Sequence, residues 1–181
     1  MFKRILVALD GSPASNAGLK VAIQLASDQR AALLGLHVID DAAIALNFEG
    51  SYFPSSYVDT FYTSLRETGR KTLAKAEALA RSANVEIKPL LVEARGAAVA
   101  HAIVQQARKA KADVIVIGTH GRRALQRMLM GSDAEAVVRE AGVPVMLVRG
   151  AEHVKRAPRK ATKTTAARAS PAPAQTSRAT A

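Results

Sequence analysis

Cysteine and tryptophan are absent from the 181-residue chain. Without cysteine the protein forms no disulfides and offers no thiolate to a metal, which excludes disulfide-stabilised scaffolds and cysteine-based metal sites. A long apolar run is also missing, because no stretch of 18 residues is hydrophobic enough to suggest a membrane span. The start, MFKRILVALDGS, lacks the apolar core and cleavage site of a signal peptide. We therefore expect a first strand there, and a cytoplasmic protein.

Acidic residues are scarce: 15 Asp and Glu stand against 26 Lys and Arg, for a net charge of +11. The excess is uneven, because residues 151–181 hold seven basic residues and one acid, a charge of +6. That segment is rich in Ala, Thr and Pro and has no apolar periodicity. We predict one domain over residues 1–150, followed by a disordered basic tail over 151–181. The tail is either a tether to nucleic acid or another anionic surface, or a solubilising segment without a partner.

Aromatic residues are few, and six of the seven fall within residues 48–62. They begin in a stretch with turn residues and continue into a helical pattern. One interpretation is a loop that packs its own small core. The other is a lid over a ligand or a surface for a partner.

Apolar segments recur along the first 150 residues, and most are continuous runs of Val, Ile and Leu, as in strands buried on both faces of a parallel sheet. The segments are 5–9, 32–38, 87–92, 114–117 and 143–148. Helical patterns separate them at 13–29, 57–83, 97–110 and 132–141. Because parallel strands need helical crossovers, this alternation predicts an α/β fold, a doubly wound parallel sheet.

Two strand ends carry residues suited to a ligand site, which in open α/β sheets lies beyond the carboxyl ends of the strands. After the first strand come Asp10, Gly11 for a turn, Ser12 as a helix N-cap and Pro13 at the first helical position. Capping explains Ser12 and Pro13, whereas Asp10 is either a turn residue or functional. The other end is Gly118.

The stretch GTHGRRALQRMLMGS at 118–132 leaves a strand through Gly118 and Gly121 and enters a helix through Gly131. The glycines could serve ordinary turns, by adopting positive φ. They could instead let the backbone approach a nucleotide, whose phosphates the N–H groups at the start of the following helix would attract. Three arginines lie in this stretch, either near those phosphates or on a solvated face: Arg122, Arg123 and Arg127.

The same stretch resembles the closing segment of the universal stress protein family, whose ATP-binding members show G-x2-G-x9-G-[ST]. Gly118, Gly121, Gly131 and Ser132 match that spacing. The segments ILVALDGSPAS and LLGLHVID resemble the family's first two strands, and VEARGAAVAHAIVQQARKAKADVIVIGTHG resembles its third strand end, third helix and fourth strand. The resemblance covers residues 1–150 and leaves out the tail.

The resemblance implies a five-stranded sheet of order 3-2-1-4-5, ATP bound with Mg²⁺ or Mn²⁺, and a homodimer paired through the edge of the fifth strand. It places Ala8 and Val38 at the adenine and Asp10 near the phosphates and their metal ion. The turn from Gly118 to Gly121 takes the ribose. The residues assigned to the phosphates are Gly131, Ser132, Asp133 and Ala134.

Two positions depart from the family's common pattern. Ala124 stands where glycine is common, and Asp133 stands where valine is common. An acid suits a helix N-terminus, but Asp133 would face the phosphates and repel them unless a cation bridges the two. His120, between the glycines, could touch the ribose or a phosphate, whereas His37 reads as a packed core residue.

No cluster of His, Asp and Glu has metal-ligand spacing, and no nucleophile, histidine and acid stand out as a catalytic triad. We therefore expect an ATP-binding stress-response or signalling module, with at most slow hydrolysis, rather than an enzyme. One alternative is an interaction module that does not bind nucleotide. Another is a nucleic-acid-associated protein that acts through its basic tail.

Overall fold

The computed structural model describes residues 1–41, 55–121 and 130–150, with side chains from residue 57 onward in the second range. The predicted tail, the first aromatic residues of the 48–62 segment, Ala124 and the three arginines after Gly121 lie outside the described residues. Both strand ends that the sequence singled out, at Asp10 and Gly118, lie within them.

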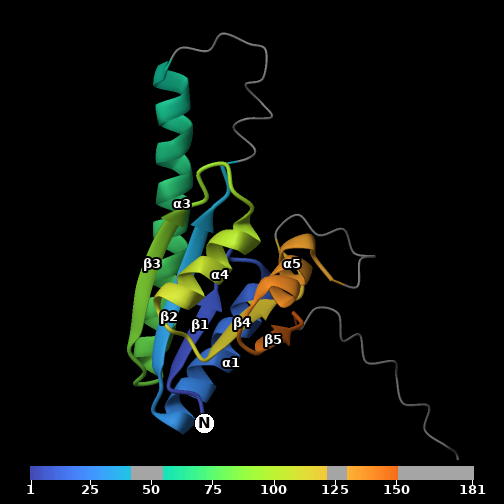
Figure 1. The fold of residues 1–181 in the computed structure, drawn as a ribbon. Coiled ribbons are helices and arrows are strands. Elements are labelled where there is room, and N and C mark those ends of the chain that lie inside the picture. Colours follow the sequence, from blue (N-terminus) through green and yellow to red (C-terminus); the bar gives the residue numbers. More distant parts are fainter. Residues whose placement is uncertain (42–54, 122–129, 151–181) are drawn as a thin grey trace, which may run out of the picture.

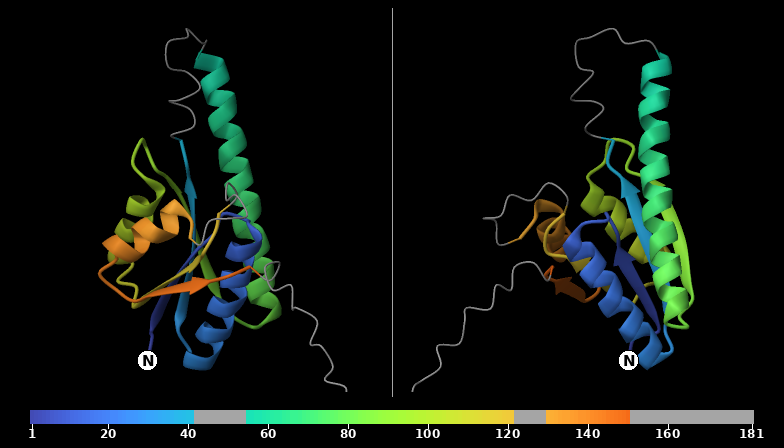
Figure 2. Two further views of the ribbon diagram at one scale, coloured as in Figure 1. Left: turned by 90° about the vertical axis from the view of Figure 1, so that its right-hand side faces the viewer. Right: turned by 180° about the vertical axis from the view of Figure 1, so that it is seen from behind.

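The fold is a five-stranded parallel sheet in the order β3-β2-β1-β4-β5, as predicted (Figure 1). The strands are β1 (Arg4–Ala8), β2 (Ala32–Ile39), β3 (Ile87–Glu93), β4 (Val114–Gly118) and β5 (Val145–Val148). The helices are α1 (Pro13–Gln29), α3 (Ser55–Ser82), α4 (Val99–Lys109) and α5 (Ser132–Glu140). Helices α1 and α3 cover one face of the sheet, and α4 and α5 cover the other (Figure 2).

The core lies on both faces of the central strands. In β1, Ile5 and Val7 face the cluster under α1 and α3, whereas Leu6 and Ala8 face the cluster under α4 and α5. Every residue of β4 is buried. Burial on both faces explains why these strands read as continuous apolar runs instead of alternating patterns.

The start of α1 follows the predicted capping pattern. Ser12 Oγ accepts a hydrogen bond from Ser15 N–H at 3.1 Å, and Pro13 opens the helix. Gly11 has φ 83°, a left-handed turn that favours glycine. Asp10 Oδ1 accepts the Ser12 N–H at 2.9 Å, so the carboxylate is fixed at the entrance to α1.

Two glycines allow helices to lie close to the sheet. A Cβ added at Gly118 would come within 2.8 Å of the Ala14 carbonyl carbon and the Ser15 nitrogen in α1. A Cβ at Gly69, midway along α3, would meet Leu91 and His37. The amino-terminal turns of α3 extend beyond the sheet (Figure 1). In the part of the chain that the structure describes, no helix is both long and apolar enough to span a membrane.

Candidate functional site

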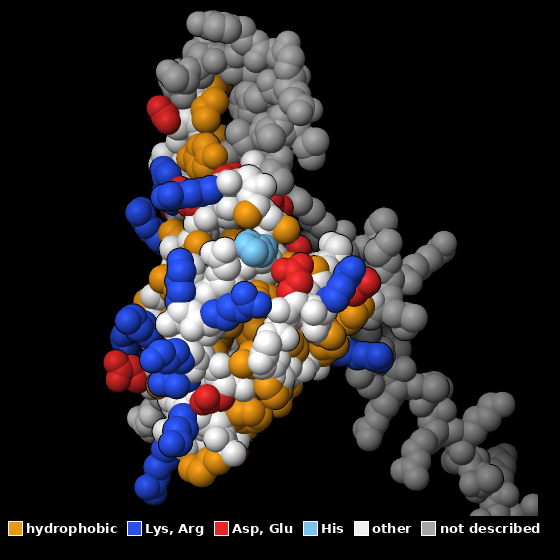
Figure 3. All heavy atoms as spheres, viewed as in Figure 1, with side chains coloured by type: hydrophobic (Ala, Val, Ile, Leu, Met, Phe, Trp, Pro, Cys, Tyr) orange, Lys and Arg blue, Asp and Glu red, His pale blue; other side chains and the backbone are white. Residues whose placement is uncertain are grey.

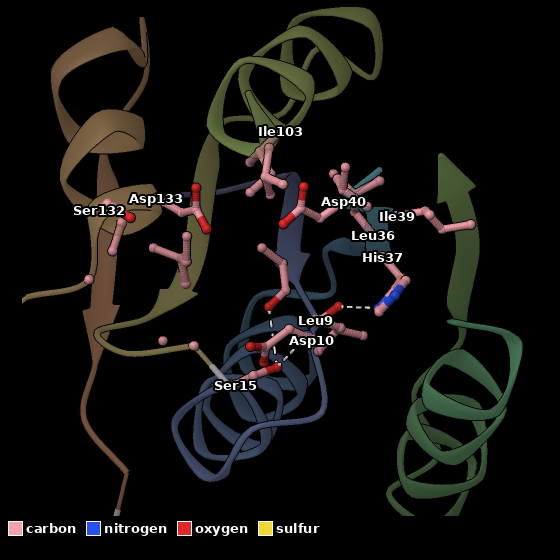
Figure 4. Close-up of a pocket in the computed structure, with 18 of the residues that line it drawn as sticks. Leu9, Asp10, Ser15, Leu36, His37, Ile39, Asp40, Ile103, Ser132 and Asp133 are labelled. Atoms are coloured by element: carbon pink, nitrogen blue, oxygen red, sulfur yellow. Dashed lines mark hydrogen bonds between the residues drawn. The ribbon is translucent and has the colours of Figure 1, made fainter. Parts of the chain in front are cut away.

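A cavity of about 520 Å³ opens at the carboxyl ends of β1 and β4. Strand order changes direction there, because β1 pairs with β2 on one side and with β4 on the other. The cavity is bounded by α4, α5, the start of α1 and part of α3 (Figure 4). Both its position and its volume are typical of a small-molecule site in an open α/β sheet.

All of the residues that the sequence singled out as ligand contacts line this cavity. They are Ala8, Asp10, Val38, Gly118, His120, Gly121, Gly131, Ser132, Asp133 and Ala134. The structure brings them together from the ends of three strands and the start of one helix. Their roles in binding stay predictions.

One wall of the cavity is apolar. Leu36 of β2, Ile103 of α4 and Ile117 of β4 line it, belong to one buried cluster, and are each less than 8% exposed. Such a wall favours a flat, weakly polar group such as a nucleobase ring, because the ring loses contact with water without leaving protein polar groups unpaired.

The opposite wall is mostly main chain. Gly131 N–H donates to the Thr119 carbonyl at 2.8 Å, which ties the turn after β4 to the start of α5. Ser12 Oγ donates to the His120 carbonyl at 3.2 Å, so α1 holds the same turn. A Cβ at Gly121 would lie 3.0 Å from Asp10 Oδ2, so the lack of a side chain lets this turn approach the carboxylate.

The N-terminus of α5 points its first turn at the cavity. The first N–H groups of any helix have no acceptor within that helix. The N-cap of α5 is Gly131, which makes no side-chain cap, and the first turn contains Ser132, Asp133 and Ala134. Because these N–H groups also form the positive end of the helix dipole, the arrangement suits an anion.

Carboxylates dominate the charge of the lining. Asp10, Asp40 and Asp133 line the cavity, and Figure 4 shows Asp40 and Asp133 directed into it from opposite sides. No Lys or Arg belongs to the part of the lining that the structure describes. An anionic ligand would therefore meet repulsion here unless a cation accompanied it.

His37 and His120 differ in burial and in hydrogen-bond partners. His37 is 6% exposed, and its Nδ1 lies 2.6 Å from the Leu9 carbonyl, so Nδ1 carries the proton and donates to that carbonyl. His120 is half-buried at the cavity, with Nδ1 2.9 Å from Thr119 Oγ1. His37 also lines the cavity, which its apolar neighbours in the sequence did not indicate.

Several lining residues were missed by the sequence reasoning. Asp40 follows β2 just as Asp10 follows β1, and that shared position at a strand end was a usable signal. Six further lining residues carry no local signal, because only the packing of α3 and α4 brings them to the cavity: Leu65, Thr68, Ala97, Ala98, Val99 and Ile103.

No group of three or more His, Cys, Asp or Glu within residues 1–41, 55–121 and 130–150 is arranged to hold a metal ion. A metal at this site would need further ligands besides the protein's carboxylates, such as the oxygens of a phosphate chain.

The family model that describes the universal stress protein family matches residues 1–149. Universal stress protein MJ0531 of Methanocaldococcus jannaschii is 34% identical over 150 residues, which are 82% of this chain and 83% of that protein. Universal stress protein YxiE of Bacillus subtilis is 30% identical over 151 residues, which cover all of that protein and 82% of this chain.

Solved structures share the fold. A universal stress family protein from Burkholderia pseudomallei has a TM-score of 0.61 at 34% identity, over 81% of this chain and 95% of that one. The protein MJ0577 has a TM-score of 0.70 at 23% identity, over 82% and 96%. The universal stress protein of Archaeoglobus fulgidus, in complex with dAMP, has a TM-score of 0.56 at 23% identity, over 81% of this chain and 97% of that one. A universal stress family protein from Arabidopsis thaliana with AMP bound has a TM-score of 0.58 at 16% identity, over 81% of this chain and 91% of that one.

The family model and the curated relatives match nearly the whole of the predicted domain, and the sheet order is the one that the resemblance implied. The chain belongs to the universal stress protein family.

Proposed function

We propose that the chain is a stress-response or signalling module that binds ATP, together with Mg²⁺ or Mn²⁺, in the cavity between β1 and β4. One observation carries the proposal: the first turn of α5, capped only by Gly131, faces an apolar wall across a cavity at the switch point of the sheet. That pairing offers main-chain donors to phosphates at one end and a dry surface to a base at the other.

The residues predicted to contact the ligand then take the following roles. Ala8 and Val38 frame the adenine, beside the apolar wall. The turn from Gly118 to Gly121, with His120 between, contacts the ribose. The phosphates lie against Gly131, Ser132, Asp133 and Ala134.

Nucleotides bound by structural neighbours support the class of ligand. The ligands dAMP and AMP in two of these neighbours are nucleoside monophosphates, and a further universal stress protein is in complex with cAMP. ATP is the finer proposal for this chain, and it rests on the glycine and serine spacing.

The carboxylates make the proposed binding dependent on a divalent cation. A triphosphate near Asp10 and Asp133 would be repelled. A divalent cation bound with it would offset this repulsion, and the two carboxylates would be suitable ligands for Mg²⁺ or Mn²⁺. Asp10 is the residue best placed for this role, because hydrogen bonding to Ser12 already orients its carboxylate.

Thermal unfolding with ATP tests the proposal. We expect ATP with Mg²⁺ to stabilise the protein by about 2.7 kcal/mol at a hundredfold excess over Kd, and ATP with EDTA to do much less. Gly131→Leu should abolish the effect, since its side chain would extend toward the turn from Thr119 to Gly121, which lines the cavity. Asp133→Asn should strengthen binding in EDTA, because it removes a repulsive charge. The absence of stabilisation at millimolar ATP with Mg²⁺ would favour the interaction module that does not bind nucleotide.

A homodimer through β5 is the second part of the proposal. Strand β5 is one edge of the sheet, and Leu147 on it is 40% exposed. An apolar edge strand exposes both main-chain hydrogen-bonding groups and hydrophobic side chains, and pairing with a second copy would cover both.

Nucleic-acid tethering through residues 151–181 is proposed on their charge alone, seven basic residues against one acid. If six or seven of these charges engage phosphates, log K should fall against log salt with a slope of about −5 to −6 on duplex DNA. The comparison is the full chain against the chain ending at residue 150. Equal affinity of the two for a fluorescent duplex would contradict the tether and leave a solubilising tail.

A further inference from the structure

A second groove, of about 730 Å³, runs along β3, the sheet edge opposite β5. Helix α3 supplies one wall and helix α4 the other, while the end of β3 and the turn after it form the floor. It shares only Ala97 with the nucleotide cavity. The lining consists of Arg66, Arg70, Leu91, Val92, Glu93, Ala94, Arg95, Ala97, His101, Ala102, Gln105, Gln106 and Lys109.

Positive charge surrounds this groove. Arg66 and Arg70 lie one turn apart on α3, Arg95 lies in the turn after β3, and Lys109 ends α4. Glu93 is the one acid among the described residues of the lining, and its Oε1 accepts from Arg66 Nη2 at 2.7 Å. Figure 3 shows Lys and Arg side chains gathered on the side of the molecule where β3 lies. The groove therefore carries an excess of positive charge after its internal ion pair is counted.

The floor offers main-chain groups to an extended partner. Ala94 donates its N–H to the Ile39 carbonyl of β2 at 3.0 Å. Because the peptide groups of a strand alternate in direction, the N–H groups of Leu91 and Glu93 point away from β2, toward the groove. Pro89 also falls at an outward position, where its missing N–H costs the β2 ladder nothing.

Arg95 is held in an unusual backbone conformation at one end of the groove. Its φ is 52° and that of the next residue, Gly96, is 76°, so two successive residues are left-handed. Gly96 N–H donates to Oδ1 of the buried Asp41 at 3.0 Å, which fixes the turn. This turn brings Arg95, an exposed residue, into the lining of the groove.

We propose that this groove binds an extended acidic segment of a partner protein, which adds to β3 as a further strand. Alternate side chains of such a segment point toward α3, where Arg66 and Arg70 lie, and toward α4, where Lys109 lies. Acidic residues at consecutive positions would therefore reach both walls. The α4 stripe from His101 to Lys109 spans about 12 Å at the helical rise, the length of about four extended residues.

Two features favour a peptide strand over nucleic acid. Among the described lining residues there is no Phe or Tyr on which a base could stack. The floor is a row of main-chain donors and acceptors, which a strand satisfies and a phosphate backbone does not. A second copy of this chain is a poor occupant, since its own groove and tail are basic.

Fluorescence anisotropy of the full chain with a labelled eight-residue peptide of Glu and Val tests the proposal. The double reversal Arg70→Glu and Lys109→Glu should weaken binding by about tenfold or more, because both side chains are exposed and line the groove. The matched control is Lys20→Glu with Lys75→Glu, two exposed positions outside the lining, which should bind like the parent. Any contribution from the basic tail is equal in the two double variants.

A peptide with N-methylated backbone amides separates strand addition from simple charge attraction, and we expect it to bind at least about tenfold more weakly than the parent peptide. Amide exchange at Leu91 and Glu93 should slow when the unmodified peptide binds. Equal binding of the methylated peptide, or equal weakening in the control variant, would overturn the proposal. So would a single-stranded DNA oligonucleotide that binds more tightly than the peptide and loses affinity only in the groove variant, because the groove would then be a nucleic-acid site.

Discussion

Gly118 and Gly131 both line the nucleotide cavity, but a side chain added at each would meet different surroundings. At Gly118 an added Cβ would meet the backbone of α1 at 2.8 Å, and backbone cannot move aside as a flexible side chain can. At Gly131 the nearest atom is the Thr119 carbonyl oxygen, at 3.4 Å, an ordinary contact. Packing against α1 therefore requires glycine at position 118. At position 131 the fold tolerates a methyl group, so any requirement for glycine there would come from a bound ligand.

We predict that Gly118→Ala lowers the free energy of unfolding by about 1–3 kcal/mol, as overpacking does, while Gly131→Ala changes it by less than about 1 kcal/mol. Urea unfolding of the two variants beside the parent makes the comparison. Equal losses in both variants would show that the approach of α1 to β4 is not as tight as the structure has it.

Asp113 is a carboxylate that joins two strands. Its Oδ2 accepts the N–H groups of Lys3 and Arg4, each at 2.7 Å, just before β1 and at its start. Those hydrogen bonds, helped by the positive side chains of the same two residues, hold the pKa of Asp113 below its ordinary value. The lowered pKa means that the ionised form is bound more tightly in the folded protein than in the unfolded chain.

The stability that Asp113 contributes should therefore be complete above about pH 4, near the pKa of an unfolded aspartate, and be lost as pH falls through the lower folded pKa. We predict that Asp113→Asn is less stable than the parent at pH 7 and that the difference shrinks below pH 4. Urea unfolding at pH 7, 4 and 3 measures it. Asp28→Asn, which removes an exposed carboxylate that accepts from the Gln24 side chain, is the matched Asp-to-Asn control. A difference for Asp113→Asn that is the same at all three pH values would refute the linkage.

Among the elements, helix α3 contains a glycine, a residue with poor helix propensity, at a position where its packing requires one. Gly69 lies at the middle of this 28-residue helix, where alanine would ordinarily gain about 1 kcal/mol. A Cβ there would lie 2.5 Å from Leu91 Cδ1 and 2.7 Å from His37 Cδ2. The Leu91 methyl can rotate, but the His37 ring is held by its hydrogen bond to Leu9.

We predict that Gly69→Ala destabilises the protein by about 1–3 kcal/mol despite its better helix propensity. Combining it with Leu91→Ala should recover part of that loss, because the second change vacates one side of the contact. Thermal or urea unfolding of the single and double variants gives the coupling. A stabilising Gly69→Ala would mean that α3 can shift outward at little cost.

Most of the strands were predictable, because a strand that is buried on both faces has a continuous run of Val, Ile and Leu in its sequence. The α1 cap was predictable from Ser12 and Pro13 for the same local reason. The contacts between Asp113 and Arg4 or between Gly69 and His37 were not, since they join residues far apart in sequence and leave no periodicity. Likewise, positive φ among the described glycines belongs to Gly11 and Gly96, not to the glycines of the 118–131 stretch.

At the scale of the whole molecule, the proposed assembly depends on the edges of the sheet. The proposed dimer pairs β5 with its copy, so a charge at Leu147 should oppose it. We predict about twice the 19.1 kDa chain mass in light scattering for the parent and the single mass for Leu147→Asp. The control, Leu79→Asp, changes a leucine of similar exposure on α3 and should leave the dimer intact. A parent that is monomeric at micromolar concentration would contradict the dimer.

The edge strand β3 bears on how far self-association of this protein can proceed. A sheet whose two edge strands can both pair with another copy can grow into a fibre, since each added copy exposes another unpaired edge strand. Here the second edge has Pro89 at an outward position, with Lys88 and the arginines around it, so two copies brought edge to edge would repel each other and find one donor missing. The proposed self-association through β5 would then be isologous and closed: each chain would use its one self-compatible edge, and growth would stop at two copies.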